Sequence, residues 1–287
     1  MTQEQDSLKY WNSHPISTDS VPFAAGTPES FEAIYEKWKK TIDAQRLAFV
    51  AQCKGRRVLE IGCGIGKDAR FLAENGVDYT GVDFSDRSLE LAKKHFALHG
   101  LKGNFVHADA TKLPFADGEF DLVFSAGVLM MVPDMKKACS EAQRVLRPGG
   151  VIRIMLYARD SYHYALVRGV VSPGIRALLK FPMFEPILEL GPPKLKLMYE
   201  ICKQHGHSVQ RVLESSADTA MPGDGNQPIG TQFTTEKEVR ALFPDIEHMK
   251  FSQHDLKYFP LPFGREMMKK HFGFFRTMTG EKRGARS

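Results

Sequence analysis

A glycine-rich stretch at residues 58–66 carries the clearest chemical signal in the sequence. An apolar run over 58–61 leads into glycines at positions 62, 64 and 66, and a stretch with helical pattern follows. Glycines allow a sharp bend and let a ligand approach the main chain without a Cβ in the way. The free N–H groups at the start of the following helix favour an acidic group. The stretch is typical of a nucleotide-binding turn between a strand and a helix.

The spacing of this turn argues against two common nucleotide sites. A dinucleotide fingerprint needs a third small residue at position 67, where this chain has Lys67. Asp68 follows instead of Ser or Thr, and no GxxxxGK motif precedes it, so the turn is not a phosphate-binding P-loop. An NAD enzyme with an unusual glycine loop stays open as an alternative, which titration with both cofactors would decide.

An acidic residue ends each of the next two expected strands, Asp83 and Asp109. A carboxylate at the end of the second strand can accept hydrogen bonds from both hydroxyls of a ribose, and one after the third can accept from an exocyclic amine. We find no anchors for several phosphates. The residues therefore predict a nucleoside site.

The elements that must position these residues alternate in type from Arg57 onward. Short apolar runs predict strands at 57–61, 79–82, 104–108, 120–125 and 151–157. Amphipathic patterns predict helices at 67–74 and 86–99, and a third with its stripe from Met135 to Leu146 that ends at Gly149-Gly150. A helix face is also expected from Phe31, Ile34, Tyr35 and Trp38. Such alternation predicts βαβ units with right-handed crossovers.

The fold class that follows is α/β: a doubly wound, mostly parallel Rossmann-like sheet with an antiparallel final strand, a helical N-terminal lid and a helical insertion. Four parts are expected along the chain: a lid at 1–50, the core at 51–157, an insertion at 158–230 that caps an acceptor pocket, and completion of the sheet with a basic C-terminus at 231–287. Helical texture resumes at 235–243, and the late strands are expected at 247–258 and 274–279.

Five ordered pieces resemble the class I S-adenosylmethionine (SAM)-dependent methyltransferases of the small-molecule, methyltransferase-11-like type. The pieces are LEIGCGIG (59–66), GVDFS (81–85), ADATKLPF (108–115), EFDLVFSAGVLMMVPD (119–134) and RVLRPGG (144–150). They come in family order and at family spacing over about a hundred residues, which is far more specific than one glycine loop. The resemblance implies SAM as cofactor and SN2 transfer of its methyl group to a small metabolite.

The resemblance also implies a role for each matching position. Glu60 and the backbone at Gly62 and Gly64 would hold the methionyl end, and Ser125 would complete the contacts to its amino group. Asp83 would bind the ribose, Phe84 would pack against the adenine, and Asp109 with the backbone of Ala110 would contact the adenine edge. Plainer interpretations stay open, because Glu60 and Asp109 could cap turns and Phe84 could belong to the core.

The acceptor pocket is expected to be apolar. Relatives often have Val-Leu-His-His where this chain has Val128-Leu129-Met130-Met131, so a base from these positions is in doubt, and either Met could simply fill the core. Tyr10 and Trp11 are expected on a lid over the cofactor, because two aromatic side chains near a terminus are costly in water.

Insertion residues complete the predicted acceptor side: Tyr157 and Tyr162 in the pocket and His163 as the first candidate for a general base. Such a base is optional, being needed for a phenol or alcohol and less for a neutral amine or a soft nucleophile. A surface or core role for His163 stays open. The acceptor atom, whether O, N, S or C, and the oligomeric state also stay open.

Composition narrows the remaining possibilities. No apolar run is long enough for a membrane span, no secretory leader is recognised, and irregularly spaced cysteines favour a reducing cytoplasm and no metal. The net charge is +5, and from Asp255 to the C-terminus eight Lys/Arg stand against three Asp/Glu. A nucleic-acid methyltransferase is therefore a rival hypothesis, although the Asn/Asp-Pro-Pro-Tyr signature is missing. A non-catalytic SAM-binding module is another.

Overall fold

The computed structural model describes residues 3–42, 44–191, 193–216, 230–256, 268 and 271–284. The chain divides into two compact units. The first comprises Met1–Leu156, Glu236–Phe251 and Thr277–Ser287, and the second comprises Tyr157–Thr235 and Ser252–Arg276. The second unit thus contains the expected insertion together with residues on its C-terminal side. Each unit is described by itself.

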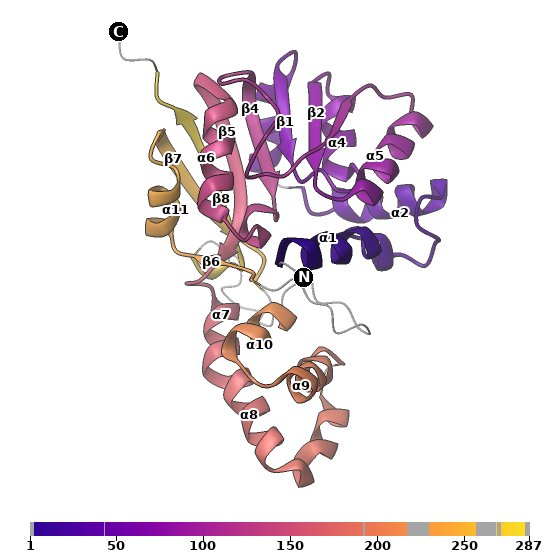
Figure 1. Ribbon diagram of the computed structural model, residues 1–287, viewed down its shortest axis with the longest axis vertical. Coiled ribbons are helices and arrows are strands. Elements are labelled where there is room, and N and C mark those ends of the chain that lie inside the picture. The colour runs from indigo at the N-terminus through magenta and orange to yellow at the C-terminus, as the bar shows by residue number, and fades with distance from the viewer. Residues whose placement is uncertain are drawn as a thin grey trace. The chain divides into compact units, whose positions relative to one another are not determined.

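A mixed sheet with the order β3-β2-β1-β4-β5-β8-β7 forms the framework of the fold (Figure 1). Its strands are β1 (Arg57–Ile61), β2 (Asp78–Asp83), β3 (Asn104–His107), β4 (Phe120–Ala126), β5 (Leu146–Ala158), β7 (Ile246–His254) and β8 (Phe275–Lys282). The first five strands pair in parallel, whereas β7 and β8 pair antiparallel. The two-residue strand β6 (Phe233–Thr234) joins the end of β5 within the second unit. The predicted α/β class with an antiparallel finish is confirmed.

The helices described in the first unit include three that begin at a capping side chain. The set is α1 (Gln3–Ser13), α2 (Pro28–Lys39), α3 (Ala44–Cys53), α4 (Lys67–Glu74), α5 (Asp86–Leu98), α6 (Met135–Val145) and α11 (Glu236–Leu242). The side chains of Thr27, Ser85 and Asp134 each accept a backbone N–H of the first turn of α2, α5 and α6. These bonds satisfy donors that a helix start leaves without an intrahelical partner.

The predicted boundaries of the nucleotide-binding part agree closely with the structure. β1 and α4 occupy the expected residues, and α5 ends one residue before the expected end. One expectation was wrong: Gly149-Gly150 do not end a helix. Instead, α6 ends at Val145, and the two glycines lie inside β5, where the pairing with β4 shifts register between Phe120 and Leu122. Gly149 takes φ +70°, which lets the strand accommodate this irregularity.

The core of the first unit forms where α3, α4 and α5 pack on the sheet. Buried apolar side chains from all three helices meet residues of β1, β2 and β4 in one cluster, which includes Phe49, Leu72, Phe96, Val58 and Leu122. A second cluster joins Phe31 and Ile34 of α2 to Ile65 and Leu91. The expected α2 face is confirmed, because all four predicted residues are buried. The N-terminal helix α2 is therefore part of the same packed body as the glycine turn.

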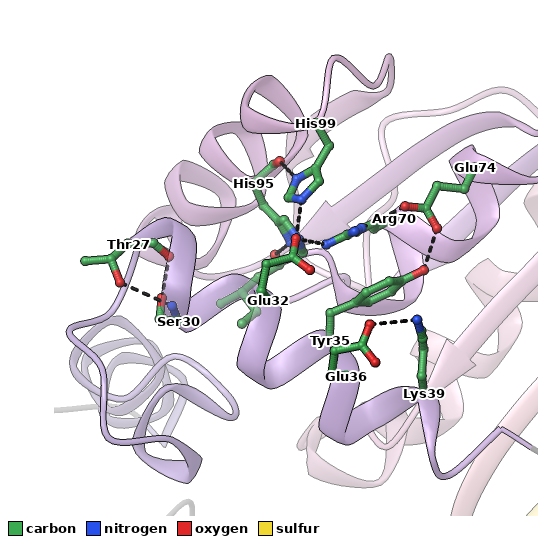
Figure 2. A network of polar contacts seen from close by, with 11 residues as sticks. Thr27, Ser30, Glu32, Tyr35, Glu36, Lys39, Arg70, Glu74, His95 and His99 are labelled. Carbon is green, nitrogen blue, oxygen red and sulfur yellow. Dashed lines mark hydrogen bonds and ion pairs between the residues drawn. The ribbon is translucent and has the colours of Figure 1, made fainter.

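Polar contacts fasten α2 to α4 and α5 (Figure 2). The Glu32 carboxylate accepts hydrogen bonds from Arg70 at 2.6 Å and from His99 at 2.5 Å. Tyr35 donates to Glu74 at 2.6 Å, and the Arg70 guanidinium lies 3.9 Å from the centre of the Tyr35 ring. Burial pushes the pKa of Glu32 upward, but the bonds from His99 and Arg70 outweigh it and lower the pKa below its ordinary value.

Among its described residues, the second unit is mostly helical, as predicted for 158–230. Its segments are α7 (Tyr162–Leu166), a π-helical turn (Val167–Val171), α8 (Ser172–Lys180), a 3₁₀ segment (Pro182–Leu190), α9 (Pro193–His205) and α10 (Val209–Ser216). An ion pair between Arg276 and Asp160 links the start of β8 to the residues before α7, at 2.5 Å. The later expectations correspond to α11, β7 and β8.

Candidate functional site

The glycine turn between β1 and α4 leaves no room for a larger residue at its first position. Gly62 takes φ +78°, and a Cβ built there would lie 2.2 Å from Cγ2 of Val128. Gly64 takes φ +53°, and its Cβ would lie 2.9 Å from Cγ2 of Ile16. Both conformations are rare for residues with a side chain. We call this glycine turn the cradle; its conformation requires glycine at both positions, which fits the close approach of a nucleoside.

Asp83, the last residue of β2, is bound directly to this turn. Its Oδ2 accepts the N–H of Gly64 at 2.8 Å, and its Oδ1 accepts the N–H of Ser85 at 2.9 Å. A carboxylate can accept about four hydrogen bonds, so beside its backbone bonds from Gly64, Ser85 and Phe84 it keeps acceptor capacity for a ribose hydroxyl. Burial raises the pKa of Asp83, and the backbone bonds oppose that rise.

Glu60 lies buried below the turn, with a side-chain partner that the sequence pattern did not reveal. The residue is 2% exposed and accepts the phenol O–H of Tyr79 at 2.6 Å. Burial, and then the neighbouring carboxylate of Asp68, raise the pKa of Glu60 well above its ordinary value. Asp68 in turn lies 3.4 Å from Arg46. The positive end of a methionyl group above this cluster would favour the ionised form of Glu60.

Ser125 is the next-to-last residue of β4, beside the same turn. It is buried, and its hydroxyl donates to the carbonyl oxygen of Ile61 at 2.9 Å. That bond ties the end of β4 to the residue just before the glycines. In this structure Ser125 therefore positions the turn, and its role in amino-group contacts stays a prediction.

The predicted adenine side gathers at the ends of β2 and β3. Phe84 is half-buried, and its ring stacks at 6.2 Å on His107, whose Nε2–H donates to the Phe84 carbonyl at 2.9 Å. Asp109 accepts two bonds from Thr111, at 2.8 Å from the backbone N–H and 2.7 Å from the hydroxyl. Ala110 beside it is buried. Asp109 thus caps its own turn, and its contact with an adenine edge stays a prediction.

The end of α1 and the residues after it lie against the cradle. Asn12 Oδ1 accepts from the Ser85 hydroxyl at 2.9 Å and from the N–H of Arg87 at 3.3 Å. Lys67 Nζ reaches the Ser17 hydroxyl at 3.4 Å. Together with the contact of Ile16 at Gly64, these bonds attach the segment 12–17 to the turn itself and to the starts of α4 and α5. Asn12 was not among the predicted residues, since a lone Asn has no pattern that reveals its partner.

The two aromatic residues predicted for the lid lie on α1. Tyr10 is 3% exposed, and its ring packs at 5.0 Å against both Trp11 and His14. Trp11 is half-buried, and its carbonyl lies 3.2 Å from the Ser85 hydroxyl. The pair is thus partly withdrawn from water in the segment that contacts the cradle.

Met130 and Met131 form a short 3₁₀ turn with Leu129 after β4. Met130 is fully buried, whereas Met131 is half-buried. A Cβ at Gly127, directly after β4, would lie 3.2 Å from the end of Met155 and 3.8 Å from the end of Met130. The wall next to Val128, which contacts Gly62, is therefore lined by thioether side chains that adapt their shape easily.

The remaining predicted acceptor residues belong to the second unit. Tyr157 is buried among Phe233, Phe274 and Phe275, and Tyr162 is half-buried at the start of α7. His163 is 1% exposed, and its Nε2 lies 2.8 Å from the Ser216 hydroxyl. Because that hydroxyl donates to the Leu213 carbonyl, it accepts from His163, and Nε2 therefore carries a proton. A role as general base stays a prediction.

Two kinds of feature are absent from the described residues. No group of three or more His, Cys, Asp or Glu in this part of the chain could hold a metal ion. No helix within the same ranges has the length and apolar character needed to cross a membrane.

The segment of the chain that contains the cradle is similar to known proteins. A family model described as a methyltransferase domain matches residues 59–154. Methyltransferase GfsG of Streptomyces halstedii is 34% identical over 148 residues, which are 50% of this chain and 48% of that protein. The phthiotriol/phenolphthiotriol dimycocerosates methyltransferase of Mycobacterium tuberculosis is 38% identical over 107 residues, or 37% of this chain and 39% of that protein. The chain thus spans less than half the length of these curated relatives.

A solved structure extends the similarity in fold beyond the matched segment. A SAM-dependent methyltransferase from Methanosarcina mazei superposes with a TM-score of 0.55 at 21% identity, covering 85% of this chain and 100% of the other. At that identity the match shows a common fold alone. The matched sequence segment contains the glycine turn, Asp83, Asp109 and Ser125, so the family similarity falls on the residues that form the cradle.

Proposed function

Since this chain belongs to the class I SAM-dependent methyltransferases, we propose that it transfers the methyl group of SAM to a small apolar or aromatic metabolite. The observation that carries the proposal is the cradle itself: Gly62 has no space for a side chain, and Asp83 is bonded to the turn with acceptor directions left over. These features fit a nucleoside whose sugar hydroxyls need a carboxylate and whose methionyl end lies close to glycine main chain.

Bound SAM supplies an electrophilic methyl group on a positively charged sulfur, so the protein mainly provides position and environment. In this proposal Asp83 accepts both ribose hydroxyls, and Phe84, Asp109 and Ala110 hold the adenine. Glu60, through the cluster with Tyr79, provides negative charge near the methionyl ammonium. Holding the acceptor atom in line with the methyl carbon and the sulfur lowers the activation free energy by on the order of several kcal/mol.

The segment 12–17 has a further role in the proposal, as a lid that closes over SAM. Its bonds from Asn12 to Ser85 and Arg87 attach it next to Asp83, and Ile16 covers the outside of the turn at Gly64. A closed segment excludes water from the reacting atoms, and loss of the sulfonium charge during transfer means that a water-poor site does not oppose the reaction.

The proposal that the acceptor is apolar rests on side chains of the first unit. Met130 and Met131 stand where relatives often have two histidines that could transfer a proton; Met130 is buried and Met131 is half-buried. Relatives of the matched segment methylate small metabolites, and one is named for phthiotriol and phenolphthiotriol dimycocerosates. A phenol or alcohol acceptor would need a base, for which we name His163, whereas a soft nucleophile would need none.

Calorimetric titration with SAM, S-adenosylhomocysteine, NAD and NADH tests the cofactor assignment. We expect binding of the two sulfur nucleosides and none of the dinucleotides. Release of S-adenosylhomocysteine is then measured with a panel of phenols, quinols, long-chain alcohols and thiols, with transfer RNA as a control. Turnover with an apolar small molecule supports the proposal. Turnover with RNA alone, or binding of NADH without SAM, would overturn it.

A further inference from the structure

The second unit exposes three large apolar side chains to solvent within a stretch of seven residues. Phe181, Met183 and Ile187 are 57%, 77% and 57% exposed. We call these three residues the apolar tip. Single exposed apolar residues are ordinary on protein surfaces, but a local group of this size marks an interaction site more often than chance. Hydration of this group costs free energy that a partner would recover.

The apolar tip stands at the far end of a long helical run. α7, the π-helical turn and α8 follow one another from Tyr162 to Lys180 (Figure 1), and a run of that length rises roughly 25–30 Å. The 3₁₀ segment with the tip comes directly after it. Leu188 of that segment is 4% exposed, and Glu185 bonds to Tyr199 and Lys203 of α9. The segment is thus anchored on its inner side while the tip points outward.

Positive charge surrounds the apolar tip. The sequence from Tyr162 to Phe184 contains three Arg/Lys and no Asp or Glu, and Arg168, Arg176 and Lys180 are all exposed. Arg176 and Lys180 are four residues apart on α8 and therefore share one face. Glu185, the next acid, has its charge offset by Lys203 at 3.0 Å. The end of the helical run thus combines exposed apolar side chains with cations that no acid between Tyr162 and Phe184 offsets.

We propose that the apolar tip docks on the surface of an anionic lipid bilayer. Phe181, Met183 and Ile187 enter the boundary between headgroups and acyl chains, while Arg176 and Lys180 bind lipid phosphates. Apolar side chains beside cations are the composition of segments that bind at the surface of an anionic membrane. Such docking would bring the second unit to apolar molecules dissolved in the bilayer.

Co-sedimentation of the full chain with vesicles tests this surface. The vesicles are pure phosphatidylcholine, or an equal mixture with phosphatidylglycerol, each at low and high salt. We expect binding to the anionic vesicles that weakens with salt. The triple variant Phe181→Ser/Met183→Ser/Ile187→Ser should lose at least about tenfold in apparent affinity. The matched control Leu47→Ser/Leu98→Ser removes exposed apolar side chains from the first unit and should bind like wild type.

A charge variant separates the two contributions. Arg176→Glu/Lys180→Glu should reduce binding to anionic vesicles by about tenfold and remove its salt dependence. Wild-type affinity of the triple variant, or no binding of the wild-type chain to either vesicle type, would overturn the proposal. So would a wild-type dimer that the triple variant converts to a monomer without any vesicle binding, because the tip would then join two copies. The measurement needs no turnover, so its failure leaves the proposed function untouched.

Discussion

The carboxylate of Asp83 accepts the backbone N–H of Gly64 at 2.8 Å, although the two residues belong to different turns of the sheet. This bond joins the glycine turn after β1 to the end of β2, the neighbouring parallel strand. It fixes the main chain that would face the methionyl end and the acid that would bind the ribose as one unit. The cradle is therefore organised before any ligand arrives, which reduces the ordering cost of binding.

Asp83→Asn should weaken SAM binding. The amide keeps the size of the side chain but replaces one acceptor oxygen with a donor, so either the Gly64 bond or a ribose bond is lost. We expect a loss of about 1–3 kcal/mol, or roughly 5- to 150-fold in Kd by calorimetry. Asp78→Asn, at the exposed start of the same strand, is the control and should bind like wild type. Equal affinities for the two variants would contradict the ribose assignment.

Gly62→Ala should be more harmful than Gly55→Ala. Both glycines have positive φ, +78° and +70°, so an added Cβ strains each by about 1–2 kcal/mol. A Cβ at Gly55 meets nothing within 4 Å, whereas one at Gly62 collides with Val128. Urea unfolding should therefore show about 1–3 kcal/mol more destabilisation for Gly62→Ala, together with weaker SAM binding. A similar free energy of unfolding for both variants would show that the turn tolerates the added methyl group.

Asn12→Ala should speed the release of SAM. The variant removes the acceptor that receives bonds from Ser85 and Arg87, so the segment 12–17 is held less firmly. Stopped-flow displacement should show release about 2- to 10-fold faster than wild type. Asn104→Ala, at the exposed start of β3, serves as control. Deletion of residues 1–20 should have a larger effect in the same direction, and unchanged affinity after that deletion would exclude a lid.

The buried imidazole of His95 should make the folded protein less stable in acid. Its ring stacks on Phe31 at 4.5 Å, and its Nδ1–H donates to the Ile65 carbonyl in the glycine turn at 3.1 Å. Burial lowers the pKa of His95 from 6.5 to about 4. Between pH 6.5 and pH 4, His95 therefore stays neutral in the folded protein but takes up a proton in the unfolded chain. Its contribution to the free energy of unfolding is complete above pH 6.5 and is lost as the pH falls toward 4.

The size of this effect is about 3 kcal/mol, since one pKa unit corresponds to about 1.4 kcal/mol. Urea unfolding at several pH values should show wild type losing about 3 kcal/mol more than His95→Gln between pH 7 and pH 4. His205→Gln, at an exposed histidine, should keep the wild-type pH dependence. Parallel curves for wild type and His95→Gln would mean that His95 is protonated in the folded state.

Local patterns in the sequence were enough to predict the strand and the helix on either side of the glycine turn. The strand signal at 57–61, with Val58, Leu59 and Ile61 as its apolar residues, and the helix signal at 67–74 each lie within a few residues, so local patterns reveal them. The irregular start of β5 was missed, because a glycine pair is equally compatible with a helix end and with a bulge inside a strand.

Side-chain partners far apart in the chain could not be predicted in this way. Tyr79 bonds to Glu60 from a neighbouring strand, and Asn12 bonds to Ser85 across 73 positions. Neither pair has a local signature, since the contact depends on strand order and on where α1 lies. Within the first unit, the sequence therefore indicated the acids of the cradle but not the side chains that orient or cover them.

A crystal structure of the chain with S-adenosylhomocysteine tests the central claim most directly. We expect the ligand in the cradle, with both ribose hydroxyls within hydrogen-bond distance of Asp83 and the homocysteine main chain against Gly62 and Gly64. Ligand density elsewhere on the chain would contradict the account. An empty cradle at saturating ligand, with the Asp83–Gly64 bond intact, would contradict it equally.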